Sequence, residues 1–207
     1  MSGKSAPLDP CRPLATADVH DGTLRGVSLA ARLDRFARTA QDVVDVGRVR
    51  ELLGAATSPW DRTTPLHVTS SALVIHPASG RVLVRWHERQ QAWLQIGGHG
   101  DPGEDDPLAV ALREGCEETG LTDLQPWPDD ALRQVVVVPV PATDRDRAHE
   151  HADLRFFLST RQPDAARPEL PGAELRWLSV PEALELATEA NVRETIRRAA
   201  RLLPGAR

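Results

Sequence analysis

The stretch from Gly97 to Leu121 restricts the fold most, because it joins a glycine-rich loop to a helix that carries a row of acids. The pattern predicts a turn over 97–104, a helix from Leu108 and a stop at Gly120. Small and apolar residues recur at helix spacing in this segment, as is typical of a stripe that faces a core: Leu108, Ala111, Leu112 and Gly115.

The same helix carries three glutamates that packing alone does not explain. Glu114, Glu117 and Glu118 are related by i, i+3 and i+4, so they share one face and their charges repel one another. They also fall in the last turn, beside the negative end of the helix dipole. A divalent cation would remove this conflict, because Mg²⁺ is held in proteins by carboxylates together with substrate phosphates.

This stretch resembles the Nudix box, the signature of Nudix hydrolases. The positions that match by type are Gly98, Glu104, Arg113, Glu114, Glu117, Glu118, Gly120 and Leu121. Eight residues, where the family has seven, separate Glu104 from Arg113, so either Glu104 or Asp105 fills the upstream acidic position. Gly115 replaces a usual aliphatic residue, which weakens a helix by about 1 kcal/mol relative to alanine. The competing interpretation is a solvated acidic helix after a turn.

The resemblance implies hydrolysis of a pyrophosphate bond in a nucleoside-diphosphate-linked compound or a nucleoside triphosphate, with Mg²⁺ or Mn²⁺ as cofactor. It also implies a ligand set for that cation: Glu114, Glu117, Glu118 and a carbonyl of Gly97 or Gly98. One of the glutamates is in addition a candidate general base. Arg113 is expected to hold the glutamates in position through paired hydrogen bonds.

A second polar group lies downstream at 149–153, in a predicted loop that leads into a strand. Glu150 is a candidate further metal ligand or base, since many Nudix enzymes have an acidic residue downstream of the box. His149 and His151 share one side if the segment is extended, and with His99 they are candidate contacts to phosphate or ribose. A solvated loop and a structural role for His99 stay equally open. Two histidines without a clear third ligand are weak evidence for zinc.

Hydrophobic periodicity predicts an α/β fold along the rest of the chain. Strands are predicted at 67–75, 81–86, 92–96, 133–138, 152–158 and 174–178, and further helices within 24–53, from Pro181 and at 191–203. This order predicts an α/β/α sandwich around a mixed sheet with an N-terminal helical extension, and the Nudix resemblance implies the same. We expect residues 1–60 to form a loose arm and the extension, and 61–207 to form the Nudix hydrolase domain with its C-terminal helix.

Composition limits the partners. A net charge of −5 gives no basic field for a nucleic-acid polymer, and no long apolar stretch predicts a membrane span or signal peptide. Two cysteines, Cys11 and Cys116, predict no disulfide framework and fit a reducing, cytoplasmic location. The expected partner is a small nucleotide or pyrophosphate compound, and a homodimer is left open.

Two other functions were weighed against hydrolysis. An isomerase of the isopentenyl-diphosphate type shares the implied fold, but its cysteine-bearing segment before the box is not apparent. A nucleotide-binding module without chemistry would normally show substitutions among the glutamates, and this chain shows none. Pyrophosphate hydrolysis is therefore the preferred prediction.

Overall fold

A computed structural model of the chain describes residues 28–36, 40–55, 58–144 and 146–203, and its strands form one mixed sheet. These strands are β1 (Leu66–His76), β2 (Arg81–His87), β3 (Ala92–Leu94), β4 (Ile96–His99), β5 (Gln125–Pro126), β6 (Gln134–Val140), β7 (His149–Ser159) and β8 (Leu175–Leu178). The main path runs β3–β2–β1–β7–β5, with β4 paired to β1, β6 to β7 and β8 to β2. Strands β1 and β7 run parallel, and the other pairs in the described part of the chain are antiparallel.

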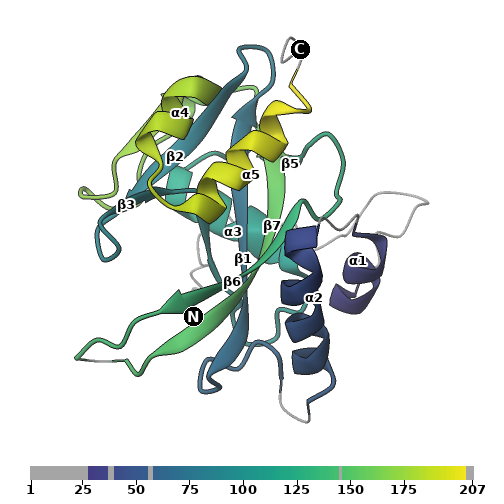
Figure 1. Cartoon of the computed structure of the whole chain (residues 1–207). Coiled ribbons are helices and arrows are strands. Elements are labelled where there is room, and N and C mark those ends of the chain that lie inside the picture. The colour runs from purple at the N-terminus through teal and green to yellow at the C-terminus, as the bar shows by residue number, and fades with distance from the viewer. Residues whose placement is uncertain (1–27, 37–39, 56–57, 145, 204–207) are drawn as a thin grey trace, which may run out of the picture.

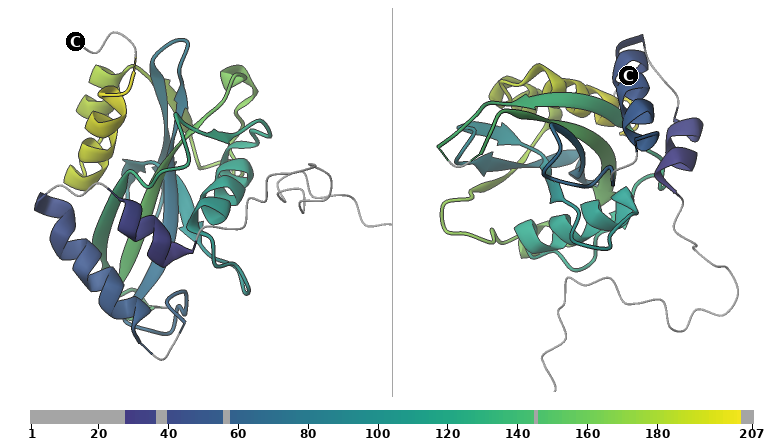
Figure 2. Two further views of the ribbon diagram at one scale, coloured as in Figure 1. Left: turned by 90° about the vertical axis from the view of Figure 1, so that its right-hand side faces the viewer. Right: turned by 90° about the horizontal axis from the view of Figure 1, so that it is seen from below.

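Helices cover both faces of this sheet (Figure 1). Helix α3 (Pro107–Thr119) lies on one face, and α4 (Val180–Leu186) and α5 (Ala190–Ala200) lie on the other, as the view from below shows (Figure 2). Helices α1 (Leu29–Arg35) and α2 (Ala40–Leu53) join the core on the α3 side, and a 3₁₀ turn at Pro163–Ala165 precedes β8. The predicted α/β/α sandwich around a mixed sheet is confirmed.

Strand β1 is the centre of the sheet and separates two hydrophobic cores. Successive side chains of a strand point to opposite faces. Ala72 and Val74 therefore pack in the core beneath α3, and Leu73 and Ile75 pack in the core beneath α4 and α5. The same alternation sends Thr69 and Ser71 to the α5 side of the sheet.

Several local expectations are wrong. The turn expected over 97–104 begins only after strand β4, which includes Gly97 and Gly98 because they pair with Ser71 and Ser70 of β1. Residues 149–151 were expected in a loop, but they begin β7, because they pair with the start of β1 and the end of β6. The last helix ends at Ala200 instead of Leu203. Cys116, expected to carry a free thiol, is disulfide-bonded. The predicted arm at 1–23 lies outside the described residues. Among the helices that the structure describes, none has the length and apolar character needed to cross a bilayer.

A buried ion pair ties α2 to the C-terminal helix. The guanidinium Nη2 of Arg198 lies 3.2 and 3.0 Å from the two carboxylate oxygens of Asp42. Only 9% of the Arg198 side chain and 2% of the Asp42 side chain are exposed. Removing one member of such a pair leaves the other charge buried with less compensation.

We expect Asp42→Ala to lower the free energy of unfolding by about 3 kcal/mol, as measured by urea denaturation. The control is Asp34→Ala, which removes an exposed ion pair to Arg50 and should cost less than about 1 kcal/mol. Equal losses in the two variants would contradict an anchoring role for Asp42.

Candidate functional site

Helix α3 begins and ends where its sequence provides caps. The Asp106 carboxylate accepts a hydrogen bond from Leu108 N at 3.0 Å, and Pro107 occupies the first helical position. At the other end, Gly120 adopts a left-handed conformation (φ 66°) and its N–H donates to the carbonyl of Cys116 at 2.7 Å. These two caps fix the ends of α3, and the packing of Leu108 and Ala111 in the core turns its apolar side to the sheet.

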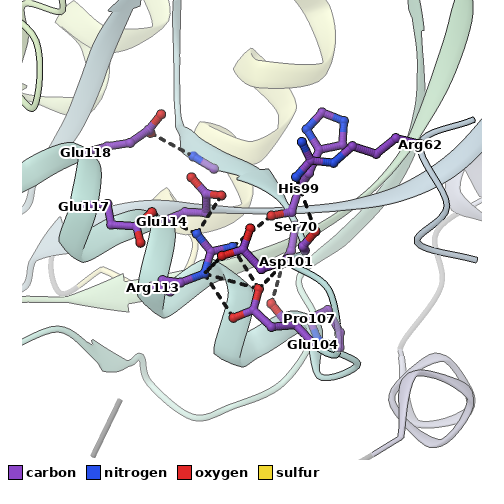
Figure 3. A network of polar contacts seen from close by, with 12 residues as sticks. Arg62, Ser70, His99, Asp101, Glu104, Pro107, Arg113, Glu114, Glu117 and Glu118 are labelled. Atoms are coloured by element: carbon purple, nitrogen blue, oxygen red, sulfur yellow. Dashed lines mark hydrogen bonds and ion pairs between the residues drawn. The ribbon is translucent and has the colours of Figure 1, made fainter. Parts of the chain in front are cut away.

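Arg113 connects the glycine loop to the acidic face of α3 (Figure 3). Its Nη1 donates to Glu114 Oε1 at 3.1 Å and to Glu117 Oε2 at 2.8 Å. Its Nη2 donates to the carbonyl of His99 at 2.9 Å. The paired hydrogen bonds expected of Arg113 are thus present, and this side chain is only 11% exposed. One guanidinium holds two carboxylates and the end of β4 together.

Glu104, and not Asp105, is the acidic partner from the loop. Both Nε and Nη2 of Arg113 donate to the Glu104 carboxylate, over distances of 2.9 to 3.2 Å. Glu104 also accepts from Asp101 N at 2.8 Å, whereas Asp105 is exposed. The extra residue in the loop therefore does not displace Glu104 from the position that faces Arg113.

Glu118 is buried beside a second arginine that the sequence analysis did not identify. Its Oε1 lies 3.1 Å from Nη1 of Arg85 on β2, and its Oε2 accepts from Gly97 N at 3.1 Å. Burial raises the pKa of Glu118 to about 7 and also raises the pKa of Glu114. The Nε of Arg85 is buried and has no hydrogen-bond partner among the described residues. The sequence signal that could have identified Arg85 was a charged residue between the apolar residues Val84 and Trp86 of a predicted strand.

The residues at this site fit a hard divalent cation. A Cβ at Gly98 would lie 2.5 to 2.7 Å from the carboxylate of Glu114, so a larger residue at this position would push that carboxylate aside. Carboxylate and carbonyl oxygens are the donors that Mg²⁺ and Mn²⁺ prefer. Burial raises the pKa of Glu114 and Glu118 although Arg113 and Arg85 lower it, so a cation beside these carboxylates would favour their charged form.

A cavity of about 190 Å³ opens on the α5 side of the sheet, next to the glycine turn. Its residues include Arg85, Gly97, Gly98, Asp153, Arg155 and Asn191. Asp153 accepts hydrogen bonds from Ser71 Oγ at 2.9 Å and from Arg155 Nε at 2.7 Å. Arg155 in turn donates to Asn191 on α5 at 2.9 Å. Sequence analysis included Asp153 in the polar group at 149–153 without giving it a role, and it missed Arg155, although both alternate with apolar residues along their strand.

Glu150 is not brought to the glutamates of α3. It lies in β7 between His149 and His151, so its side chain points away from the cavity, to the face of the sheet that α2 covers. There its carboxylate accepts from Nη1 and Nη2 of Arg48 on α2, at 3.0 and 2.5 Å. The geometry does not support the predicted role of Glu150 as a further ligand or base.

The three histidines proposed as substrate contacts do lie together, and His67 joins them. The Nε2 atoms of His67 and His99 are 3.1 Å apart, as are those of His149 and His151. Burial lowers the pKa of His99 to about 3 and that of His151 to about 4, so both rings are neutral near pH 7. His99 and His151 also line the cavity.

Comparison with known proteins is consistent with this geometry. The family profile for the NUDIX domain matches residues 65–199. The chain is 29% identical, over 125 residues, to a probable DHNTP pyrophosphohydrolase of Lactococcus lactis subsp. cremoris (strain MG1363), covering 56% of this chain and 68% of the relative.

Two solved structures have a similar fold. One is an Ap4A hydrolase of C. elegans in a binary complex, with a TM-score of 0.54 and 20% identity, covering 67% of this chain and 98% of the other. The second is the E. coli dihydroneopterin triphosphate pyrophosphohydrolase, with a TM-score of 0.50 and 18% identity, covering 63% and 92%. At these identities the likeness concerns the fold alone.

We expect Glu104→Gln to lower the free energy of unfolding by about 2 kcal/mol, because Arg113 loses its charged partner in the loop. The matched control is Asp105→Asn, which neutralises the adjacent exposed carboxylate and should change stability by less than about 0.5 kcal/mol. Urea denaturation measures both, and indistinguishable curves would argue against a special role of Glu104.

Proposed function

The chain belongs to the Nudix hydrolase family, whose members act on pyrophosphate bonds, and from this premise we propose a metal-dependent reaction on a nucleotide. The proposed substrate is a nucleoside-diphosphate-linked compound or a nucleoside triphosphate, and the proposed cofactor is Mg²⁺ or Mn²⁺. The observation that carries the proposal is the Arg113 network, which fixes two glutamates of α3 beside the glycine turn.

In this proposal Glu114, Glu117 and Glu118 hold the cation, and the backbone of Gly98 adds an oxygen. When bound, the cation supplies positive charge to the phosphate oxygens and promotes attack by water. Arg113 holds the carboxylates of Glu114 and Glu117 in place, because its guanidinium donates hydrogen bonds to both of them and to Glu104 of the glycine loop at the same time.

Two arginines on the cavity side are proposed to meet the phosphates. Arg85 has a buried Nε without a partner among the described residues, and its Nη1 lies beside Glu118. Arg155 is held by Asp153 and Asn191, so its guanidinium is oriented before substrate arrives. A glutamate of α3 is the proposed acceptor of the proton from water, because Glu150 is held away from the cavity by Arg48 of α2.

Aromatic stacking is not part of the proposed recognition. Trp86 and Trp93 pack against one another with ring centroids 5.6 Å apart, and neither lines the cavity. The chain contains no tyrosine. Polar contacts along the cavity are therefore proposed to select the substrate, with the phosphate chain as the part they recognise most strongly.

The first experiment is a hydrolysis screen with product identification. The panel contains nucleoside triphosphates and nucleoside-diphosphate-linked compounds, and it adds dihydroneopterin triphosphate and Ap4A because relatives carry those names. Release of phosphate, pyrophosphate or a nucleotide would support hydrolysis. Double-bond migration in isopentenyl diphosphate without phosphate release would instead support an isomerase, and tight binding with neither reaction would support a binding module.

We expect removal of divalent cations with EDTA to abolish hydrolysis, and readdition of Mg²⁺ or Mn²⁺ to the dialysed protein to restore it. The physical reason is that carboxylates alone repel the phosphates that they are meant to bind. Undiminished turnover in the metal-free protein would contradict the proposed cofactor.

We expect Glu117→Gln to lower kcat by about 100-fold or more, because it removes a proposed ligand while keeping the side-chain volume. Its melting temperature should change little, since this side chain is 36% exposed. Glu185→Gln, a change at an exposed glutamate of α4, is the control and should keep full activity. Equal kcat in the two variants would exclude Glu117 from the metal site.

A further inference from the structure

Four histidines gather at one end of the sheet, outside the acidic face of α3. We propose that His67, His99 and His151, with His149 as the fourth ligand, bind a transition metal ion of the zinc class. This site is separate from the carboxylate site and uses different chemistry, because imidazole suits Zn²⁺ and similar ions whereas Mg²⁺ takes oxygen ligands.

Strand register brings these residues together from distant parts of the chain. His67 on β1 lies directly opposite His151 in the parallel pair with β7. His99 at the end of β4 is paired with Thr69, two residues along β1 on the same face. One nitrogen of each of the three rings lies within 4.8 Å of the other two. The sheet itself therefore builds a three-histidine group.

The distances suit a tetrahedral ion. A Zn–N bond of about 2.0–2.1 Å places neighbouring ligand nitrogens about 3.3 Å apart. The Nε2 atoms of His67 and His99 are 3.1 Å apart, and those of His149 and His151 are also 3.1 Å apart. Each close pair is near that separation, and the nitrogens of His67, His99 and His151, which lie within 4.8 Å of one another, would draw together around the ion.

Backbone carbonyls set the orientation of two of the rings. The Nδ1 of His67 lies 3.1 Å from the carbonyl of Thr64, and the Nδ1 of His149 lies 2.8 Å from the carbonyl of Arg147. A carbonyl only accepts, so each Nδ1 carries the proton and each Nε2 presents a lone pair to the cluster. Carbonyls hold metal-binding histidines in this way in known sites.

The charge around the cluster does not exclude a cation. The positive charge of Arg62 would repel a cation near His67 and His99, and the positive charge of Arg89 would repel one near His151. Two carboxylates offset this repulsion, because the negative charge of Asp61 would attract a cation near His67 and that of Asp153 would attract one near His151. His67 is almost fully buried, which favours a neutral ring that can ligate.

The alternative is a metal-free hydrogen-bonded cluster, in which His99 and His151 donate from Nε2 to the lone pairs of His67 and His149. It explains the two short contacts equally well. The two cases differ in what the protein does with added metal, so a binding measurement separates them.

The test uses the full-length chain, prepared without a polyhistidine tag and stripped with a chelator. Titration with Co²⁺ should produce the strong visible absorption of tetrahedral nitrogen coordination and saturate at one ion per chain, and Zn²⁺ should then displace the cobalt. A weak, octahedral spectrum or no saturation would overturn the proposal. Because the wild-type chain is used, the result does not depend on a variant that folds.

Variants assign the ligands. His151→Gln should weaken cobalt binding by more than about 100-fold, and His149→Gln should weaken it by about 10-fold or more. The control is His76→Gln, at a histidine on β1 whose Nδ1 lies 2.7 Å from Ser79 Oγ and which should leave binding unchanged. Binding by His151→Gln equal to the wild type, in a variant that melts cooperatively, would overturn the assignment.

Metal binding at the histidines does not require the carboxylates of α3. Glu117→Gln should retain the cobalt spectrum of the wild type even though it loses hydrolysis. A chain that hydrolyses with Mg²⁺ but never binds cobalt would overturn the histidine site alone. Loss of the cobalt spectrum in Glu117→Gln would also overturn it, because it would place the ion at the carboxylates.

Discussion

The arrangement of the glycine loop depends on one buried guanidinium. Arg113 reaches Glu104 in the loop, Glu114 and Glu117 on α3, and the carbonyl of His99 at the end of β4. An isolated charge at this depth would be costly, but here every face of the fork has an acceptor. Because Arg113 is planar and always charged, it fixes the relative positions of three chain segments, which lysine could not do.

Strand alternation decides which polar residues share the site. On β7, His149, His151, Asp153 and Arg155 all point to the α5 side, where the cavity lies. Glu150 lies between two of them and points to the other side, where Arg48 binds it. Strand alternation therefore gathers the other polar residues of β7 on the cavity side but excludes Glu150 from that side. Glu150 instead links α2 to the sheet through its ion pair with Arg48.

The sequence predicted best what depends on local pattern. Helix α3, its stop at Gly120 and the order of the strands follow from spacing and caps, and the Nudix profile supports the family. Contacts that depend on strand register could not be predicted, because the residues of one strand do not by themselves specify which residues of the neighbouring strand lie opposite them. Arg85 beside Glu118 and His67 beside His99 are of this kind. Gly115 was recognised in the sequence as unusual, but its cause was not. A Cβ at this position would lie 2.8 Å from a methyl carbon of Leu124, and this contact can be seen only in the structure.

Two groups of possible metal ligands lie next to each other at the end of β4: the carboxylate oxygens of α3 and the imidazole nitrogens of the histidine cluster. Gly98 lies against the Glu114 carboxylate, and the next residue, His99, turns its ring toward the imidazole cluster while its carbonyl accepts from Arg113. Oxygen donors favour Mg²⁺ or Mn²⁺ and imidazoles favour Zn²⁺, so two cations could occupy adjacent places without competing for ligands. An ion held by His99 would also fix the end of β4, and through that carbonyl it would restrain Arg113. The histidine cluster is thus placed to stabilise the proposed hydrolytic site without taking part in its chemistry.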